Sequence, residues 1–262
     1  MLYLTIFAKN LKQQTMYRSE FLLASVGSLL FIYVQIAIWR ALLGQDAADT
    51  AVTISMMVTY VIVALVLQRV SRTYFPRDFK QKVTDGDISI DLIRPVGLKN
   101  MMMSQQLGEN VCTLLFSCLP VAVVAGFIWG FEFAASPALL GLFVLSAIFA
   151  IALRFYAEYI FGLLVFWVRD DVYTRQISSG LMMIFAGAAV PLWFYPDWLR
   201  AIGTFLPFGL MAFEPIQIFL ATVTVSQAFT IILRQVAWLL GLWLIERFVW
   251  SRIKHNVFVQ GG

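Results

Sequence analysis

The sequence has very few of the residues on which enzymatic sites depend. Its only histidine is His255, so no histidine-based metal site or buried Ser–His pair can form within the apolar segments. No GxxxxGK[ST] phosphate loop occurs, so the chain cannot hydrolyse ATP by itself in the usual way. No pair of Asp residues falls inside an apolar stretch, which argues against an intramembrane aspartyl enzyme. These absences predict a protein with no catalytic site, metal site or cofactor of its own.

Charge is also scarce. Charged residues make up 13% of the 262 residues and hydrophobic residues 61%, whereas a soluble domain is about a quarter charged and about half apolar. The composition therefore excludes an ordinary soluble protein. The net charge of +4 indicates no nucleic-acid partner, because the positive charges lie at the ends of apolar stretches, where they set membrane topology.

Long apolar stretches are what the sequence has instead. A helix that crosses the hydrocarbon core of a bilayer needs about 20 mostly apolar residues. The stretches predict an all-α integral membrane protein with six transmembrane helices in a single domain, 1–262. The predicted spans are Phe21–Leu43, Ala51–Gln68, Leu107–Phe131, Ala138–Val168, Ser178–Trp193 and Phe229–Trp250.

The distribution of positive charge orients these spans. With the N-terminus inside, fifteen of the nineteen Lys and Arg residues fall in inner segments. Cytoplasmic loops carry an excess of Lys and Arg, so both termini are predicted to be cytoplasmic. The expected location is the cytoplasmic (inner) membrane, crossed several times.

The first residues, 1–20, form a weakly amphipathic pattern. Leu2, Ile6 and Leu11 alternate with Lys9 and Lys12 in a way that suits a helix lying on the inner membrane surface. A short solvated tail is the alternative.

A basic segment, 69–105, separates the second and third spans. Pro76 can start a short helix, because its fixed φ suits the first helical turn. Phe75, Phe79 and Val83 recur at helical spacing, and Gly86 ends the helix. Such a cytoplasmic helix is suited to docking a soluble partner. The alternative is a solvated basic loop that only enforces topology.

A region broken by prolines, 191–225, precedes the last span. Pro191, Pro196, Pro207 and Pro215 interrupt it at intervals too short for full spans. Its aromatic residues suit a membrane interface. Two short helices that dip into the outer leaflet would fit this pattern, and an aromatic-rich surface loop is the alternative.

Two ionisable residues, Arg154 and Glu158, lie one helical turn apart near the middle of the fourth span. Charged groups at that depth are costly, so they are expected to pair. The pair can be purely structural, or it can act on a substrate or in coupling. Arg40 and Arg234 lie near the outer ends of their spans, where they can snorkel to the interface without a function.

Three motifs in order give the chain a family resemblance. They are the inner GDISIDLIRPV segment, the PLWFYPDWL…LPF block before the last span, and the basic tail that ends in VQGG. With these motifs the chain resembles the membrane permease subunits of bacterial ATP-binding-cassette exporters of the ABC-2 type.

The resemblance implies roles for two sets of residues. A coupling helix between spans two and three would dock on an ATPase, and a re-entrant outer gate would lie between spans five and six. The implied coupling residues are Pro76, Phe79, Lys82, Gly86, Asp87, Arg94 and Pro95, and the implied gate residues are Pro191, Trp193, Pro196, Trp198, Pro207 and Phe208.

The resemblance also implies partners. Two permease chains would work with two ATPase chains, the second permease being a copy of this chain or a paralogue, and ATP and Mg would bind to the ATPase. The substrate would be amphipathic: a drug, lipid, peptide or glycan precursor. Two other classes stay open, an ion-coupled secondary transporter that uses Glu158 and a membrane enzyme that uses Asp170 and Asp171.

Overall fold

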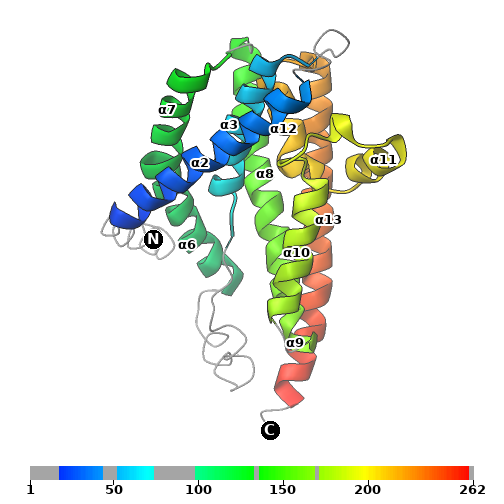
Figure 1. Ribbon diagram of the computed structural model, residues 1–262. Coiled ribbons are helices and arrows are strands. Elements are labelled where there is room, and N and C mark those ends of the chain that lie inside the picture. Colours follow the sequence, from blue (N-terminus) through cyan, green and yellow to red (C-terminus); the bar gives the residue numbers. More distant parts are fainter. Residues whose placement is uncertain (1–17, 44–51, 74–97, 133–135, 169–170, 260–262) are drawn as a thin grey trace.

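The computed structural model describes residues 18–43, 52–73, 98–132, 136–168 and 171–259. Every regular element in these ranges is helical (Figure 1). In chain order they are α2 (Arg18–Leu43), α3 (Ile54–Val70), α6 (Leu98–Thr113), η1 (Leu114–Cys118), α7 (Leu119–Trp129), α8 (Pro137–Leu163), α9 (Val165–Val168), α10 (Asp171–Phe185), η2 (Leu192–Phe194), α11 (Asp197–Phe205), η3 (Gly209–Met211), α12 (Phe213–Phe219) and α13 (Val225–Val259).

Four helices within the described ranges are long and apolar enough to cross a membrane: Phe21–Leu43, Leu98–Trp129, Pro137–Val168 and Val225–Ile253. The prediction of an all-helical, multi-pass membrane protein is confirmed. The other two predicted spans correspond to shorter helices, since α3 has 17 residues and α10 has 15. The count of six therefore stays a prediction.

The boundaries of the predicted fifth span are wrong. The helix α10 begins at Asp171 and ends at Phe185, whereas hydropathy placed the span at 178–193. Backbone hydrogen bonding continues through the polar residues that precede Ser178, because helix formation does not require every side chain to be apolar. The chain then leaves the helix at Gly187, whose φ of +70° is not helical.

Local sequence signals explain where two helices begin. Thr53 precedes α3, and its hydroxyl accepts a hydrogen bond from the amide of Met56 at 3.2 Å. Ser136 does the same for α8 through the amide of Leu139, and Pro137 occupies the first helical position. Both residues satisfy amides that have no partner within their own helix.

The helix that starts at Leu98 changes its winding in the middle. Residues Leu114–Cys118 form one π-helical turn, in which the amide of Leu119 donates to the carbonyl of Leu114. Pro120 follows immediately, and a proline has no amide hydrogen to donate and crowds the preceding turn. The wider turn lets the helix continue through the proline as α7.

The helices form two lobes that share α3. The first lobe comprises α2, α3, α6, η1 and α7, and the second comprises α8 to α13. One side of α3 packs in the first lobe through Met57, Val61 and Leu65, while Tyr60 and Leu67 pack in the second. Because α3 is buried on nearly all sides, it is the helix through which the lobes contact each other (Figure 1).

The lobes meet again at the end of the bundle where α13 finishes, the lower end in Figure 1. There Leu98 and Met102 of α6 pack against Tyr159 and Leu163 of α8 and against Ile253 of α13. Contacts at two levels therefore hold the lobes together, one centred on α3 and one on the first turns of α6.

The turn after α10 gives a first prediction. A Cβ atom on Gly187 would lie 2.9 Å from the Cβ of Phe213, and its positive φ disfavours any other residue. Gly187→Ala should lower the free energy of unfolding by about 2 kcal/mol or more, since overpacking and a left-handed backbone add up. Thermal unfolding of the purified protein in detergent measures this loss.

Gly180→Ala is the matched control for that substitution. Gly180 lies within α10, and a Cβ there would meet nothing within 4 Å. Alanine favours a helix over glycine by about 0.5–1 kcal/mol, so this variant should unfold at the same temperature or slightly higher. Equal destabilisation by the two substitutions would contradict the tight packing inferred at Gly187.

Candidate functional site

The proline-broken region folds as two dissimilar halves. The helix α12 lies inside the bundle, where all of its residues except Gln217 are buried. The helix α11 projects from the side of the bundle (Figure 1) and leaves the side chains of Trp198 and Phe205 66% and 75% exposed. The region thus combines a buried helix and a peripheral amphipathic helix, and their position in the outer leaflet stays a prediction.

The six predicted gate residues divide in the same way. Pro191, Pro207 and Phe208 are buried, and Trp193 is half-buried. The ring of Trp193 lies between those of Tyr60 and Phe213, with centroid distances of 5.5 and 5.2 Å. It therefore joins α3 to α12.

The remaining two, Pro196 and Trp198, are exposed on and before α11. Their side chains are at the periphery of the bundle, next to the ion pair between Asp197 and Arg200 on the same helix. The structure brings four of the six residues to one packed region and leaves these two outside it.

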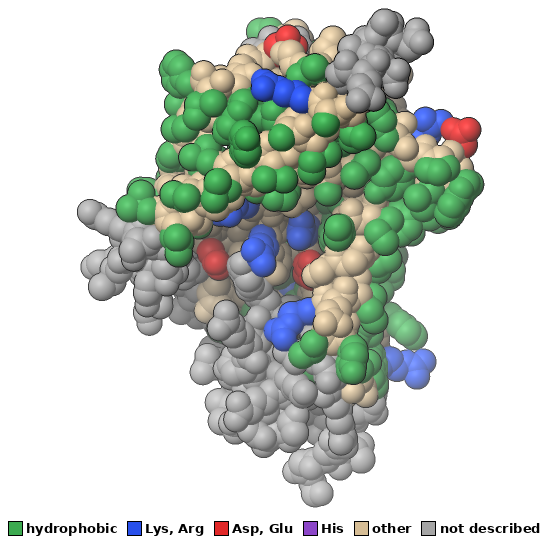
Figure 2. All heavy atoms as spheres, in the orientation of Figure 1, with side chains coloured by type: hydrophobic (Ala, Val, Ile, Leu, Met, Phe, Trp, Pro, Cys, Tyr) green, Lys and Arg blue, Asp and Glu red, His purple; other side chains and the backbone are tan. Residues whose placement is uncertain are grey.

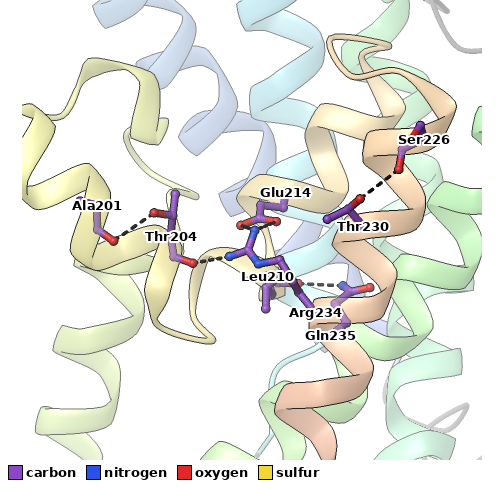
Figure 3. Close-up of polar contacts among 8 residues, drawn as sticks. All are labelled: Ala201, Thr204, Leu210, Glu214, Ser226, Thr230, Arg234 and Gln235. Atoms are coloured by element: carbon purple, nitrogen blue, oxygen red, sulfur yellow. Dashed lines mark hydrogen bonds and ion pairs between the residues drawn. The ribbon is translucent and has the colours of Figure 1, made fainter.

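A partly buried ion pair that the sequence analysis missed holds this region to the last helix. In Figure 3, Arg234 of α13 points towards Glu214 of α12, and its Nη1 lies 2.9 Å from each carboxylate oxygen. Its Nη2 donates to the carbonyl oxygen of Thr204 near the end of α11. Arg234, which was expected only to snorkel, has protein partners as well, because one guanidinium group connects α11, α12 and α13.

The neighbouring residue, Gln235, makes a second set of contacts between elements. Its Nε2 donates to the carbonyl oxygen of Ser146 on α8 at 3.0 Å and to that of Leu210 in η3 at 2.9 Å. Both acceptors are buried. Helical spacing could not reveal the contacts of Gln235, because its partners lie on different elements. The pair of Glu214 and Arg234 did leave a signal in the sequence, since a Glu and an Arg within apolar segments are expected to pair.

Tyr60 connects α3 to the same region. Its hydroxyl donates to the carbonyl oxygen of Gly187, in the turn that follows α10. The amide of Phe213, at the start of α12, donates to the carbonyl oxygen of Ala186 at 3.1 Å. The buried end of α12 is thereby held to both α3 and α10.

The predicted pair Arg154–Glu158 lies on the face of α8 that meets α10. Arg154 Nη2 is 3.9 Å from Glu158 Oε1, and Ser178 of α10 donates to the other carboxylate oxygen at 2.9 Å. Arg72, just after α3, interacts electrostatically with both residues and with Glu109 of α6. We call Arg72, Glu109, Arg154, Glu158 and Ser178 the polar cluster.

The Arg154–Glu158 pair is only partly covered. Figure 2 shows basic and acidic side chains gathered in a recess below α2, with hydrophobic side chains above it and to its right. The side chains of Arg154 and Glu158 are 17% and 18% exposed. The pair is therefore mostly covered by protein but still accessible from one side.

Further polar contacts position the ends of α3 and α6. Gln106 Nε2 donates to the carbonyl oxygen of Arg72 at 2.8 Å and to Asn110 Oδ1 at 2.9 Å. Arg69 Nη2 donates to the carbonyl oxygen of Ala24 on α2 at 3.2 Å. Lys99 of α6 forms an ion pair of 3.0 Å with Glu246 of α13.

The coupling residues predicted between α3 and α6, Pro76 to Pro95, lie outside the described residues. Of the interfacial helix predicted at 1–20, residues 1–17 lie outside them too, and 18–20 belong to α2. Asp170 and the side chain of Asp171 also lie outside the described residues. Within the described ranges, no group of three or more His, Cys, Asp or Glu side chains is arranged to hold a metal ion.

The ion pair of Glu214 and Arg234 generates a second prediction. Arg234→Gln leaves the buried carboxylate of Glu214 without its partner, and because the Arg234 side chain is itself 37% exposed, the expected loss of unfolding free energy is about 1–3 kcal/mol. The double variant Glu214→Gln/Arg234→Gln should recover part of that loss, because no unpaired charge remains. Thermal unfolding in detergent measures both.

Arg200→Gln is the control for this pair. Arg200 contacts Asp197, whose side chain is 92% exposed, so its loss should change the unfolding free energy by less than about 1 kcal/mol. The single variant Glu214→Gln completes the comparison. If the double variant loses as much unfolding free energy as Glu214→Gln and Arg234→Gln together, the two side chains do not stabilise each other.

Comparison with known proteins places this architecture in a family. Neither the curated proteins nor the solved structures gave a match. The profile of the ABC-2 family transporter proteins matches residues 21–255, from the start of the first long apolar helix almost to the end of the last. Its members are membrane permease components of ABC transporters. Since the match covers most of the sequence, this chain belongs to the ABC-2 transporter family.

Proposed function

We propose that the chain is the transmembrane permease subunit of an ATP-driven exporter, powered by a separate ATPase subunit. It would form half of a translocation path for an amphipathic substrate. The observation that carries the proposal is the family match over residues 21–255, on a bundle of long apolar helices. The lack of a phosphate loop in the sequence supports a division of labour in which ATP and Mg bind to the partner.

In this proposal α3 and α10 complete a set of six passes. They cover about 26 and 22 Å at 1.5 Å per residue, somewhat less than a hydrocarbon core of about 30 Å. Both lie between longer helices, and Gln106 and Tyr60 provide contacts for their ends. With six passes both termini lie on the same side, which the distribution of Lys and Arg favours as the cytoplasm.

The coupling of ATP hydrolysis to transport would start at the segment 74–97. This segment connects the end of α3 to the start of α6, and Gln106 of α6 donates to the carbonyl oxygen of Arg72, just after α3. A force applied to the segment would reach α3 directly. Because α3 packs in both lobes, its movement would alter their relative position.

The same movement would reach the opposite side of the membrane through the contacts of α12. Tyr60 and Trp193 join α3 to this region, and Arg234 joins α12 to α11 and α13. The partner would thus bias two arrangements of the permease through differential contacts at the docking surface. The gate would respond as a packed unit and not as a flexible loop.

The third prediction concerns the partner. A tagged chain purified in mild detergent should recover a soluble ATP-binding subunit, identified by mass spectrometry and an ATPase assay. Arg94→Glu and Phe79→Ala should each reduce the recovered ATPase at least about tenfold, which corresponds to a loss of about 1.4 kcal/mol of binding free energy. Arg200→Gln, on α11, should leave recovery unchanged.

Two outcomes would contradict this proposal. Recovery of the chain without any ATPase in several detergents would favour the ion-coupled transporter, in which Glu158 would carry the coupling. Equal recovery with Arg94→Glu and Arg200→Gln would refute docking through the segment 74–97. Mass spectrometry of the same purified sample would reveal whether a second permease accompanies the chain.

The fourth prediction concerns orientation. With Cys112 and Cys118 replaced by alanine, Asp197→Cys should react in intact cells with a membrane-impermeant maleimide, since the Asp197 side chain is 92% exposed at the α11 end. Lys82→Cys should react only after the cells are permeabilised. Reaction of Lys82→Cys in intact cells would show that the topology is inverted.

A further inference from the structure

We propose that the polar cluster binds the phosphate-bearing, anionic headgroup of a lipid-like amphiphile that reaches it from the bilayer. This inference rests on the proposed export function and names the chemistry of its substrate. It requires a donor group without a sufficient acceptor, an opening towards lipid, and apolar surfaces for the tails.

The donor is the guanidinium group of Arg154. Its Nη2 lies 3.9 Å from Glu158, which is beyond hydrogen-bond distance, and its Nε is buried without an acceptor among the described residues. Glu158 in turn accepts a hydrogen bond from Ser178. A guanidinium group carries five N–H donors in a planar fork, and buried donors are rarely left unsatisfied in folded proteins. Arg154 therefore has one buried donor, Nε, without an acceptor, and only a long contact from Nη2 to Glu158.

The cluster has two guanidinium groups that could meet different oxygens of one anion. Arg72 brings a second guanidinium group into electrostatic range of Arg154. Glu109, on the α6 side, interacts with Arg72, and Glu158 lies beside Arg154. Two arginines can bind separate oxygens of one phosphate, and arginine binds phosphate in a bidentate manner. Glu109 and Glu158, the two carboxylates of the cluster, oppose such binding.

The surroundings of the recess indicate that the anion comes with apolar tails. Hydrophobic side chains lie above the recess and to its right in Figure 2. On α2, which borders it above, Val26 and Leu30 are 56% and 61% exposed, and on α10 Ile177 and Ile184 are 56% and 46% exposed. Both helices present these side chains on the outside of an apolar bundle, where lipid is the solvent. A headgroup in the recess would leave its tails against them.

The test uses the full-length purified chain in a neutral detergent, without any ATPase. Native mass spectrometry and a titration of intrinsic tryptophan fluorescence would measure binding of dioctanoyl phosphatidylglycerol and of dioctanoyl phosphatidylcholine. The two probes share their tails and differ in net charge. We expect the anionic lipid to bind at least tenfold more tightly, and glycerol phosphate, which has no tails, to bind at least tenfold more weakly than the anionic lipid.

Three variants assign this preference to the cluster. Arg154→Gln should abolish the preference for the anionic lipid, Arg154→Lys should retain part of it, and Glu158→Gln should increase it by removing a repulsive charge. Arg247→Gln is the matched control, because Arg247 is exposed on α13 and stacks on Trp243. It should change the preference less than twofold.

Several results would overturn the inference. These are equal affinity for the two lipids, equal loss of the preference in Arg154→Gln and Arg247→Gln, or equal binding of glycerol phosphate, which would identify a site for free anions. If Arg154→Gln does not elute as a folded protein in size-exclusion chromatography, the result with Glu158→Gln is decisive. An increased preference of this variant for the anionic lipid supports the site, and an unchanged preference refutes it. Because no ATPase is present, the result stands apart from the test of the export function.

Discussion

The structure depends on one constraint: polar groups within an apolar bundle must find partners in other parts of the same protein. Lipid offers them no hydrogen bonds, so each unpaired group would cost several kcal/mol. Glu214 and Arg234 satisfy each other across two helices, and the remaining donor of Arg234 binds the carbonyl of Thr204. Gln235 likewise satisfies two carbonyls on separate elements. The polar residues thereby fix how the short helices of the α11–α12 region pack.

The apolar contacts place α3 at the centre of this arrangement. Its side chains divide between the two largest clusters of buried residues, and its Tyr60 reaches the turn after α10. A helix covered on all sides cannot move without displacing its neighbours, because protein interiors are close-packed. This property makes α3 a suitable connection between the segment proposed to dock an ATPase and the buried α12. The polar cluster lies at its lower end, near the place where the first turns of α6 pack against α8 and α13.

Sequence reasoning succeeded where composition over long windows carries the information and failed where the result depends on single partners. Hydropathy correctly predicted an all-helical, multi-pass membrane protein, and the motifs correctly predicted the ABC-2 family. It misplaced α10, because an apolar window does not register a helix that begins in polar residues and ends at a left-handed glycine. It also treated Arg234 as a snorkelling residue, since the partner Glu214 lies in a different helix. The coupling residues from Pro76 to Pro95 stay predictions.

By itself the sequence determined that the protein is an integral membrane protein that crosses the bilayer as helices, because this follows from the length of the apolar stretches and the scarcity of charge. It also determined membership of a permease family, through the order of short motifs. The pairing of Arg154 and Glu158 was also within its reach, since the two residues share one helix face. Only the tertiary structure decided which gate residues are buried, that Arg234 joins three helices, and that Arg72, Glu109 and Ser178 gather around Arg154. These contacts join residues far apart in the chain, so no local pattern encodes them, and they form only when the helices pack.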